Sequence, residues 1–274
     1  MSAAMTLASC GGTKDAGQQQ DAAALIQRSD IKIEGKRMTP EALWAMGRIG
    51  SVAVSPDEKQ IAYTVSYYSV PQNKSNSEVF VMNADGSGNT QITHDAWQEG
   101  QPTWFKDGKK LAFLCNESGS SQVWEMNPDG SNPRQVTDIP DGINGYVYAP
   151  DMSKIVYLKD VQLEPTVQDL YPDLPKAKAR IVDDQFYRHW NDWVDAYTHL
   201  FIADYVPAQP ITTGKDIMEG ERWESPVRPW GGVEQLAWTK DGKKLIYTCR
   251  KKIGIDYAES TNTDLYAYNT ENGE

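Results

Sequence analysis

Short apolar strands recur along this chain, and each begins four residues after an aspartate in a Pro-Asp-Gly-type turn. Within each unit an Ile or Leu opens the strand and a Tyr or Phe follows two positions later, as Leu111 and Phe113 do. Asp and Gly suit these turns because both tolerate the positive φ that tight hairpins need. A repeat of about 40–50 residues predicts the blades of a β-propeller. The four aspartates are Asp57, Asp107, Asp151 and Asp241, spaced 50, 44 and 90 residues apart.

The predicted strands carry apolar side chains on both faces. In the strand 110–114 and just beyond it, Leu111, Phe113 and Cys115 alternate with Ala112 and Leu114. A strand that is apolar on both faces belongs to a sheet covered from both sides. One blade cannot cover its own faces, so the pattern predicts several stacked sheets.

The interval between Asp151 and Asp241 can hold two blades, or one blade with an insertion. It contains one clear inner strand at 154–158, one clear outer strand at 199–204 and no further turn signal. The sequence therefore favours one blade with an insertion at about 159–198.

The last unit begins at Gln235, includes the strand 264–269 and lacks the segment that would form its final strand. We predict an all-β fold, an incomplete β-propeller of four-stranded antiparallel blades over residues 37–274, with about four blades present. A ring halted there would leave strand edges open, so we expect the amino-terminal part of a longer protein.

Composition narrows the possible functions. The chain has 27 basic and 38 acidic residues, a net charge of −11 and no basic stripe, which argues against nucleic-acid binding through phosphates. No apolar stretch approaches the ~20 residues of a membrane-spanning helix. No phosphate loop or dinucleotide fingerprint occurs, so no cofactor is predicted. Thr39 and Pro40 predict a short helix over 39–47, ended by Gly47.

The three cysteines fall into two groups. Cys115 and Cys249 occupy equivalent strand positions in different blades, so we expect two buried thiols rather than a disulfide. Cys10, in Leu7-Ala8-Ser9-Cys10-Gly11, resembles the lipidated cysteine of bacterial lipoproteins. That resemblance implies a leader and polar linker over 1–36, a membrane tether and a cell-envelope location. Only nine residues precede Cys10 and none is basic, so a chance match is the alternative.

Three segments together resemble the bacterial prolyl oligopeptidase family of serine peptidases, of the acylaminoacyl-peptidase and dipeptidyl-peptidase-five type. They are the Met-Asn-x-Asp-Gly-Ser turns, the opening 38–44, and the aromatic run 186–193 followed by His199. The resemblance implies a propeller that gates access for short peptides to a carboxy-terminal α/β-hydrolase domain. That domain would carry a Ser-Asp-His triad, so no catalytic residue is assigned here. A non-enzymatic Tol-type periplasmic propeller that binds proteins is the alternative. Oligomeric state stays open.

The chain by itself offers no catalytic constellation. It contains no Gly-x-Ser-x-Gly elbow, and His94, His189 and His199 lack the spacing of a zinc site, so no metal ligand is assigned. Candidate substrate contacts lie in two places. Arg188, Trp190 and Trp193 in the insertion could rim a substrate cavity, or its aromatics could fill the core of an enlarged blade.

The second candidate is the acidic stretch Glu219, Glu221 and Glu224 around Trp223. The resemblance to dipeptidyl-peptidases implies that Glu221 and Glu224 could hold a substrate's amino terminus through charge-assisted hydrogen bonds. A solvated loop is the alternative.

Overall fold

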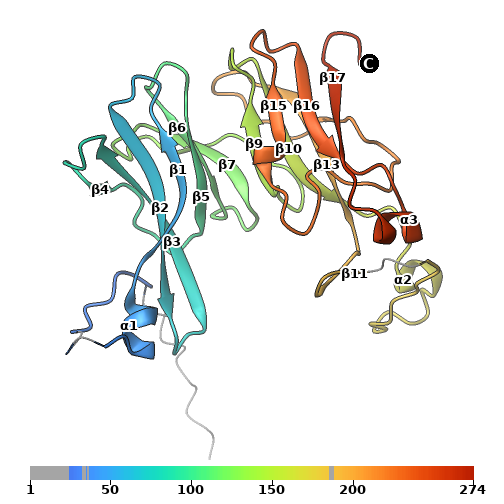
Figure 1. Ribbon diagram of the computed structural model, residues 1–274, viewed down its shortest axis with the longest axis horizontal. Helices are drawn as coiled ribbons and strands as arrows, with labels where there is room; N and C mark the ends of the chain where they lie inside the picture. The colour runs from blue at the N-terminus through green and yellow to red at the C-terminus, as the bar shows by residue number, and fades with distance from the viewer. Residues whose placement is uncertain (1–24, 33–34, 36, 185–187) are drawn as a thin grey trace, which may run out of the picture.

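Four antiparallel sheets of three or four strands follow one another along the described residues, and we number them blades 1 to 4 (Figure 1). The computed structural model describes residues 25–32, 35, 37–184 and 188–274. Blade 1 contains β1 (Arg48–Val54), β2 (Gln60–Ser69), β3 (Lys74–Asn83) and β4 (Thr90–Gln91); blade 2 contains β5 (Glu99–Trp104), β6 (Leu111–Cys115), β7 (Gln122–Met126) and β8 (Arg134–Gln135); blade 3 contains β9 (Gly145–Tyr148), β10 (Lys154–Val161), β13 (Tyr197–Asp204) and β14 (Lys215–Asp216); and blade 4 contains β15 (Leu236–Trp238), β16 (Lys244–Cys249) and β17 (Asp264–Asn269).

Neighbouring strands within each blade are consecutive in the sequence, except at one place in blade 3. There β10 pairs with β13, and the residues between them leave the sheet and return. Among the described residues, this interval forms one four-stranded sheet, with an insertion between β10 and β13. Blade 4 has three strands among the described residues, in the order β15-β16-β17.

The predicted turn chemistry is present in each unit. Asp107 Oδ1 accepts a hydrogen bond of 3.0 Å from the Lys109 backbone N–H, and Gly108 between them has a φ of +69°. The Asp151 turn forms the same bond, with Met152 at a φ of +60°. The aspartate thus fixes the turn in both cases, while glycine only removes the cost of the left-handed backbone.

The two faces of β6 pack against different blades. Leu111, Phe113 and Cys115 join Ala62 and Val79 of blade 1 in one apolar cluster. On the opposite face, Ala112 and Leu114 belong to a second cluster that includes Tyr146 and Ile155 of blade 3. The expectation of a sheet covered from both sides is confirmed.

Blades 3 and 4 share a third apolar cluster, which includes Leu200 of β13, Leu245 of β16 and Cys249. Cys115 and Cys249 are both buried and free, as predicted. Polar side chains also join the blades: the Trp104 indole N–H donates to the Ala53 carbonyl at 3.1 Å, and the Tyr205 hydroxyl donates to buried Glu125 at 2.7 Å.

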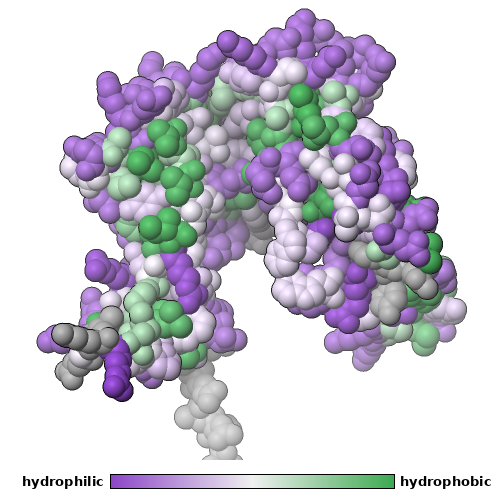
Figure 2. Space-filling model, in the orientation of Figure 1, coloured by the Kyte–Doolittle hydropathy of each residue, from purple (hydrophilic) through white to green (hydrophobic). Residues whose placement is uncertain are grey.

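Helices are few and short. α1 (Pro40–Ala45) begins after Thr39, whose hydroxyl accepts from the Ala42 N–H at 3.2 Å, in agreement with the predicted cap. Two others are α2 (Val167–Leu170), inside the insertion, and α3 (Gly254–Glu259), between β16 and β17. Among the described residues no helix is both long and apolar enough to cross a bilayer. Figure 2 shows a deep notch between the half built from blades 1 and 2 and the half built from blades 3 and 4.

Candidate functional site

The insertion of blade 3 contains two small elements. α2 is closed at its start by a capping box, in which the Thr166 hydroxyl accepts from the Asp169 N–H while the Asp169 carboxylate accepts from the Thr166 N–H. The second element is a hairpin of β11 (Arg188–His189) and β12 (Asp192–Trp193). Figure 1 shows β11 below the sheet of blade 3, on the open side of the notch.

Two consecutive side chains at the end of β11 differ sharply in exposure. His189 is buried, with 6% of its surface exposed, whereas Trp190 is 74% exposed. Trp190 begins the turn with a φ of +54°, and Arg188 closes it by donating from Nη2 to the Asn191 carbonyl at 2.8 Å. The hairpin therefore presents a histidine inward and a tryptophan outward.

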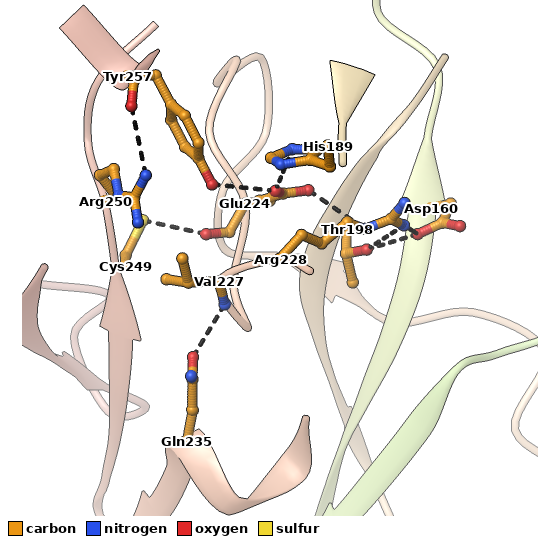
Figure 3. A network of polar contacts seen from close by, with 10 residues as sticks. All are labelled: Asp160, His189, Thr198, Glu224, Val227, Arg228, Gln235, Cys249, Arg250 and Tyr257. Atoms are coloured by element: carbon orange, nitrogen blue, oxygen red, sulfur yellow. Dashed lines mark hydrogen bonds and ion pairs between the residues drawn. The ribbon is translucent and has the colours of Figure 1, made fainter. Parts of the chain in front are cut away.

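The buried His189 contacts the carboxylate of Glu224 (Figure 3). This carboxylate, 2% exposed, has Oε1 2.8 Å from His189 Nε2 and Oε2 3.4 Å from Arg228 Nε. The Tyr257 hydroxyl of α3 donates to Oε1 at 3.4 Å, and burial raises the pKa of that phenol above its ordinary value, so the proton stays. A buried carboxylate needs such partners because an unpaired charge in the interior is costly. We call these four residues the Glu224 network.

Arg228 extends this network into the sheet of blade 3. Its Nη2 lies 3.0 Å from Asp160 Oδ1 on β10 and 2.9 Å from Thr198 Oγ1 on β13. The Thr198 hydroxyl also donates to Asp160 at 2.6 Å. The loop that carries Arg228 is therefore tied to the regular strands, which fixes the guanidinium beside Glu224 (Figure 3).

A second buried histidine, His199, holds the loop that leads to Glu224. His199 of β13 is completely buried, with Nδ1 2.8 Å from Asp216 Oδ2 and Nε2 2.9 Å from the Glu221 carbonyl oxygen. The Glu221 backbone is thus fixed, and its side chain is half-buried. Glu219 is exposed. The alternative of a solvated acidic loop is therefore correct for Glu219 and wrong for Glu224, because Glu224 pairs with residues distant in sequence.

A cleft of about 1130 Å³ lies between the insertion, the loop 222–224 and α3. Polar and apolar side chains share its lining, and two pairs of its charges are matched: Arg180 forms two bonds of 2.7 and 2.8 Å with Asp195, and Arg222 lies 2.7 Å from Glu164. No group of three or more metal-ligating side chains occurs in the part of the chain that the structure describes. The cleft can hold a small polar ligand, with charges already fixed in position.

The structure brings only some of the predicted residues to this cleft. Trp193 and Glu224 line it, whereas Arg188, Trp190 and Glu221 do not. Trp193 lies between two guanidinium groups, 4.5 Å from that of Arg180 and 4.8 Å from that of Arg188.

Trp190 instead packs against Trp230, at 5.0 Å between ring centroids. The alternative that the insertion's aromatics fill a core is wrong for Trp190 and Trp193, since both are exposed. Cys10, Phe186 and Tyr187 lie outside the described residues.

Sequence reasoning missed Arg228, Trp230 and Tyr257. A signal existed for the first two, because Arg228 follows Glu224 by four residues and Trp230 stands between Pro229 and Gly231. An exposed aromatic within a Pro/Gly-rich loop is a feature worth marking as a binding candidate. Tyr257 gave no signal, since its role depends on the packing of α3 beneath the cleft.

Comparison with known proteins agrees with the fold described above. The family profile of the TolB beta propeller domain matches residues 31–188, and the chain belongs to this family. Within it, the chain is a propeller segment related to dipeptidyl-peptidase 5. It is 45% identical over 239 residues to the enzyme of that name from Porphyromonas gingivalis, and 42% identical over 240 residues to that of Porphyromonas endodontalis.

These alignments cover 87% and 88% of the chain but 35% of each relative, so the chain spans about a third of the relatives' length. Among solved structures, an acylaminoacyl peptidase bound to a chloromethyl ketone matches with a TM-score of 0.57 at 14% identity, over 85% of this chain and 32% of that one. The Pyrococcus horikoshii acylaminoacyl peptidase matches with a TM-score of 0.55 at 16% identity, over the same shares. At this level of identity, these two matches concern the fold alone.

Proposed function

We propose that this chain is the propeller part of a serine exopeptidase that removes dipeptides from the amino ends of short peptides. The observation that carries the proposal is the 45% identity to dipeptidyl-peptidase 5 along 87% of the chain. The triad would lie in a part of the protein outside this chain, which itself contains no Gly-x-Ser-x-Gly elbow. The chain alone is then expected to be inactive.

The propeller's contribution is to select and admit substrates. The cleft beside the insertion is open, lined by polar and apolar side chains, and large enough for a few residues of extended peptide. Its walls come from a long loop set on rigid strands, the arrangement in which binding residues are commonly found. Arg180, Asp195, Arg222 and Glu164 supply ordered charges that a peptide backbone and its termini can meet. Folded proteins would be excluded by size.

Glu224 has a structural part in this proposal. Its carboxylate is buried and already paired with His189 and Arg228, so it organises the wall of the cleft. A substrate amine would meet the more exposed carboxylates of the cleft, such as Asp195 and Glu164.

For location, we propose that Cys10 is lipidated and tethers the protein to a membrane of the bacterial envelope. The support is the sequence Leu-Ala-Ser-Cys-Gly. Metabolic labelling with an alkyne fatty acid tests this: label should appear on the full-length protein and be lost in Cys10→Ser. Labelling that persists in Cys10→Ser would contradict the proposal.

The test of activity uses the full-length gene product. It should release nitroaniline from dipeptidyl-nitroanilides with a free amino terminus, fail on their acetylated counterparts, and react with a fluorophosphonate probe. Arg222→Ala, at the cleft, should raise KM several-fold, while Lys106→Ala, in the turn before β6, should not. A full-length protein without peptide release or probe labelling would overturn the proposal and favour a non-enzymatic, protein-binding propeller.

A further inference from the structure

Two tryptophans stand together at the surface, outside the cleft. Trp190 in the β11–β12 turn and Trp230 in the loop before blade 4 are 74% and 75% exposed, and their ring centroids are 5.0 Å apart with the planes inclined by 54°. Indoles bring more apolar area than other side chains and are normally covered in large part. A tilted pair leaves one broad ring face of each indole available to a third group.

The buried carboxylate of Glu224 contacts both segments that carry the tryptophans. Trp190 directly follows His189, which lies 2.8 Å from Glu224, and Trp230 follows by two residues Arg228, which lies 3.4 Å from the same carboxylate. The Glu224 network therefore fixes both segments that carry the tryptophans. Since those segments come from the insertion and from the loop before blade 4, their contact is a product of the network and not of local sequence.

The backbone at Trp190 departs from the usual preference of a bulky residue. Its φ of +54° lies in the left-handed region, where Gly, Asn and Asp are the favoured residues. The turn could be made at lower cost with glycine or asparagine at this position, yet a large exposed aromatic stands there. Such conformations persist where the surroundings impose them, and they gather at binding and active sites.

We propose that the Trp190–Trp230 pair is a subsite for an apolar or aromatic side chain of an extended peptide, and that Glu224 is its positioning residue. This inference rests on the proposed function. The occupant follows from continuity with the cleft, whose wall includes His189, which precedes Trp190 in the chain, and Glu224, which contacts His189 and Arg228. Arg188, two residues before Trp190 in the same hairpin, carries a positive charge that disfavours a cationic side chain at the pair.

The experiment measures binding to this chain itself, labelled with 5-fluorotryptophan and observed by fluorine NMR. The probes are Ala-Phe-Ala-Ala amide and Ala-Ala-Ala-Ala amide. The resonances of Trp190 and Trp230, assigned from the Phe variants, should shift with the first peptide, and its affinity should be about 3- to 10-fold higher. Trp190→Ala and Trp230→Ala should each remove this preference, and both positions are exposed enough to leave the fold intact.

Two further variants separate the roles. Trp97→Ala removes an exposed tryptophan of the loop before β5 and should leave the preference unchanged. Glu224→Gln keeps both indoles and the size of the side chain, but should move the two resonances in the free protein and reduce the preference. A purely structural effect elsewhere would not move these two signals selectively.

Equal affinities for the two peptides, with both resonances unmoved, would overturn the proposal. Concentration-dependent broadening of the two resonances without peptide would also overturn it, in favour of a contact between copies of the chain. If the full-length protein released dipeptides while the Trp variants kept the substrate preference, this inference alone would fail. If the chain preferred the Phe peptide but the full-length protein released nothing, the proposed function would fail and the subsite would stand.

Discussion

His189 Nε2 lies 2.8 Å from Glu224 Oε1, and this contact joins the insertion of blade 3 to the loop that leads into blade 4. Both side chains are buried, so neither can be replaced by water without rearrangement of the wall of the cleft. The contact thus belongs to the fold and to the candidate site at once.

Removal of the Glu224 carboxylate should destabilise the chain strongly. In Glu224→Ala, Arg228 and His189 lose a buried partner, and breaking a buried pair from one side costs about 3–5 kcal/mol. Urea denaturation should report this as a lower midpoint, and amide exchange at 188–193 should quicken. Glu219→Ala, at an exposed position of the same loop, should stay within about 0.5 kcal/mol of the parent chain. Similar midpoints for the two variants would show that the network contributes little.

Glu99 should make stability fall as the pH rises. Burial raises the pKa of this carboxyl from 4.5 to about 9, so the folded chain keeps a proton that the unfolded chain releases between those values. Because the folded state binds more protons in that window, each pH unit weakens folding by up to about 1.4 kcal/mol.

Glu99→Gln removes this titration and should melt a few degrees higher than the parent chain at pH 8. Thermal unfolding from pH 5 to 9 checks the slope, with exposed Glu117→Gln as the matched control. Parallel pH curves for the parent chain and Glu99→Gln would mean that Glu99 is ionised when folded.

The interface between blades 1 and 2 should be sensitive to cavities. Leu111 is fully buried in the cluster that the two blades share, so Leu111→Ala should lower the free energy of unfolding by about 2–5 kcal/mol. Leu265 on β17 is 74% exposed, and Leu265→Ala should change it by less than about 0.5 kcal/mol. The pair of variants carries the same chemical change, so equal effects would argue against the described packing.

The two strand cysteines should be unreactive until the chain unfolds. Burial raises the pKa of both the Cys115 and Cys249 thiols to about 12, which leaves almost no thiolate at neutral pH. In a Cys10→Ser background, a thiol reagent should label neither cysteine in buffer and both in denaturant. Labelling of the native chain at the rate of a free thiol would contradict their burial.

The sequence alone determined the repeating architecture. The aspartate of each turn and the strands that are apolar on both faces are local features, which do not depend on which blades pack together. Asp107 accepts the hydrogen bond of its turn, and Leu111 and Ala112 face opposite neighbouring blades. The insertion in blade 3 was also predictable, because the 90 residues from Asp151 to Asp241 are about twice the usual interval between turn aspartates. Turn chemistry and side-chain alternation operate within a few residues, so one sequence suffices to reveal them.

The tertiary structure decided which polar residues are buried and which aromatics are exposed. By composition, Glu219 and Glu224 are equivalent members of one acidic stretch, and Trp190 has the character of a core residue. Glu224 is buried because His189, Arg228 and Tyr257 reach it from three separate segments. A charge can leave water only where such partners converge, and that convergence depends on how distant segments pack.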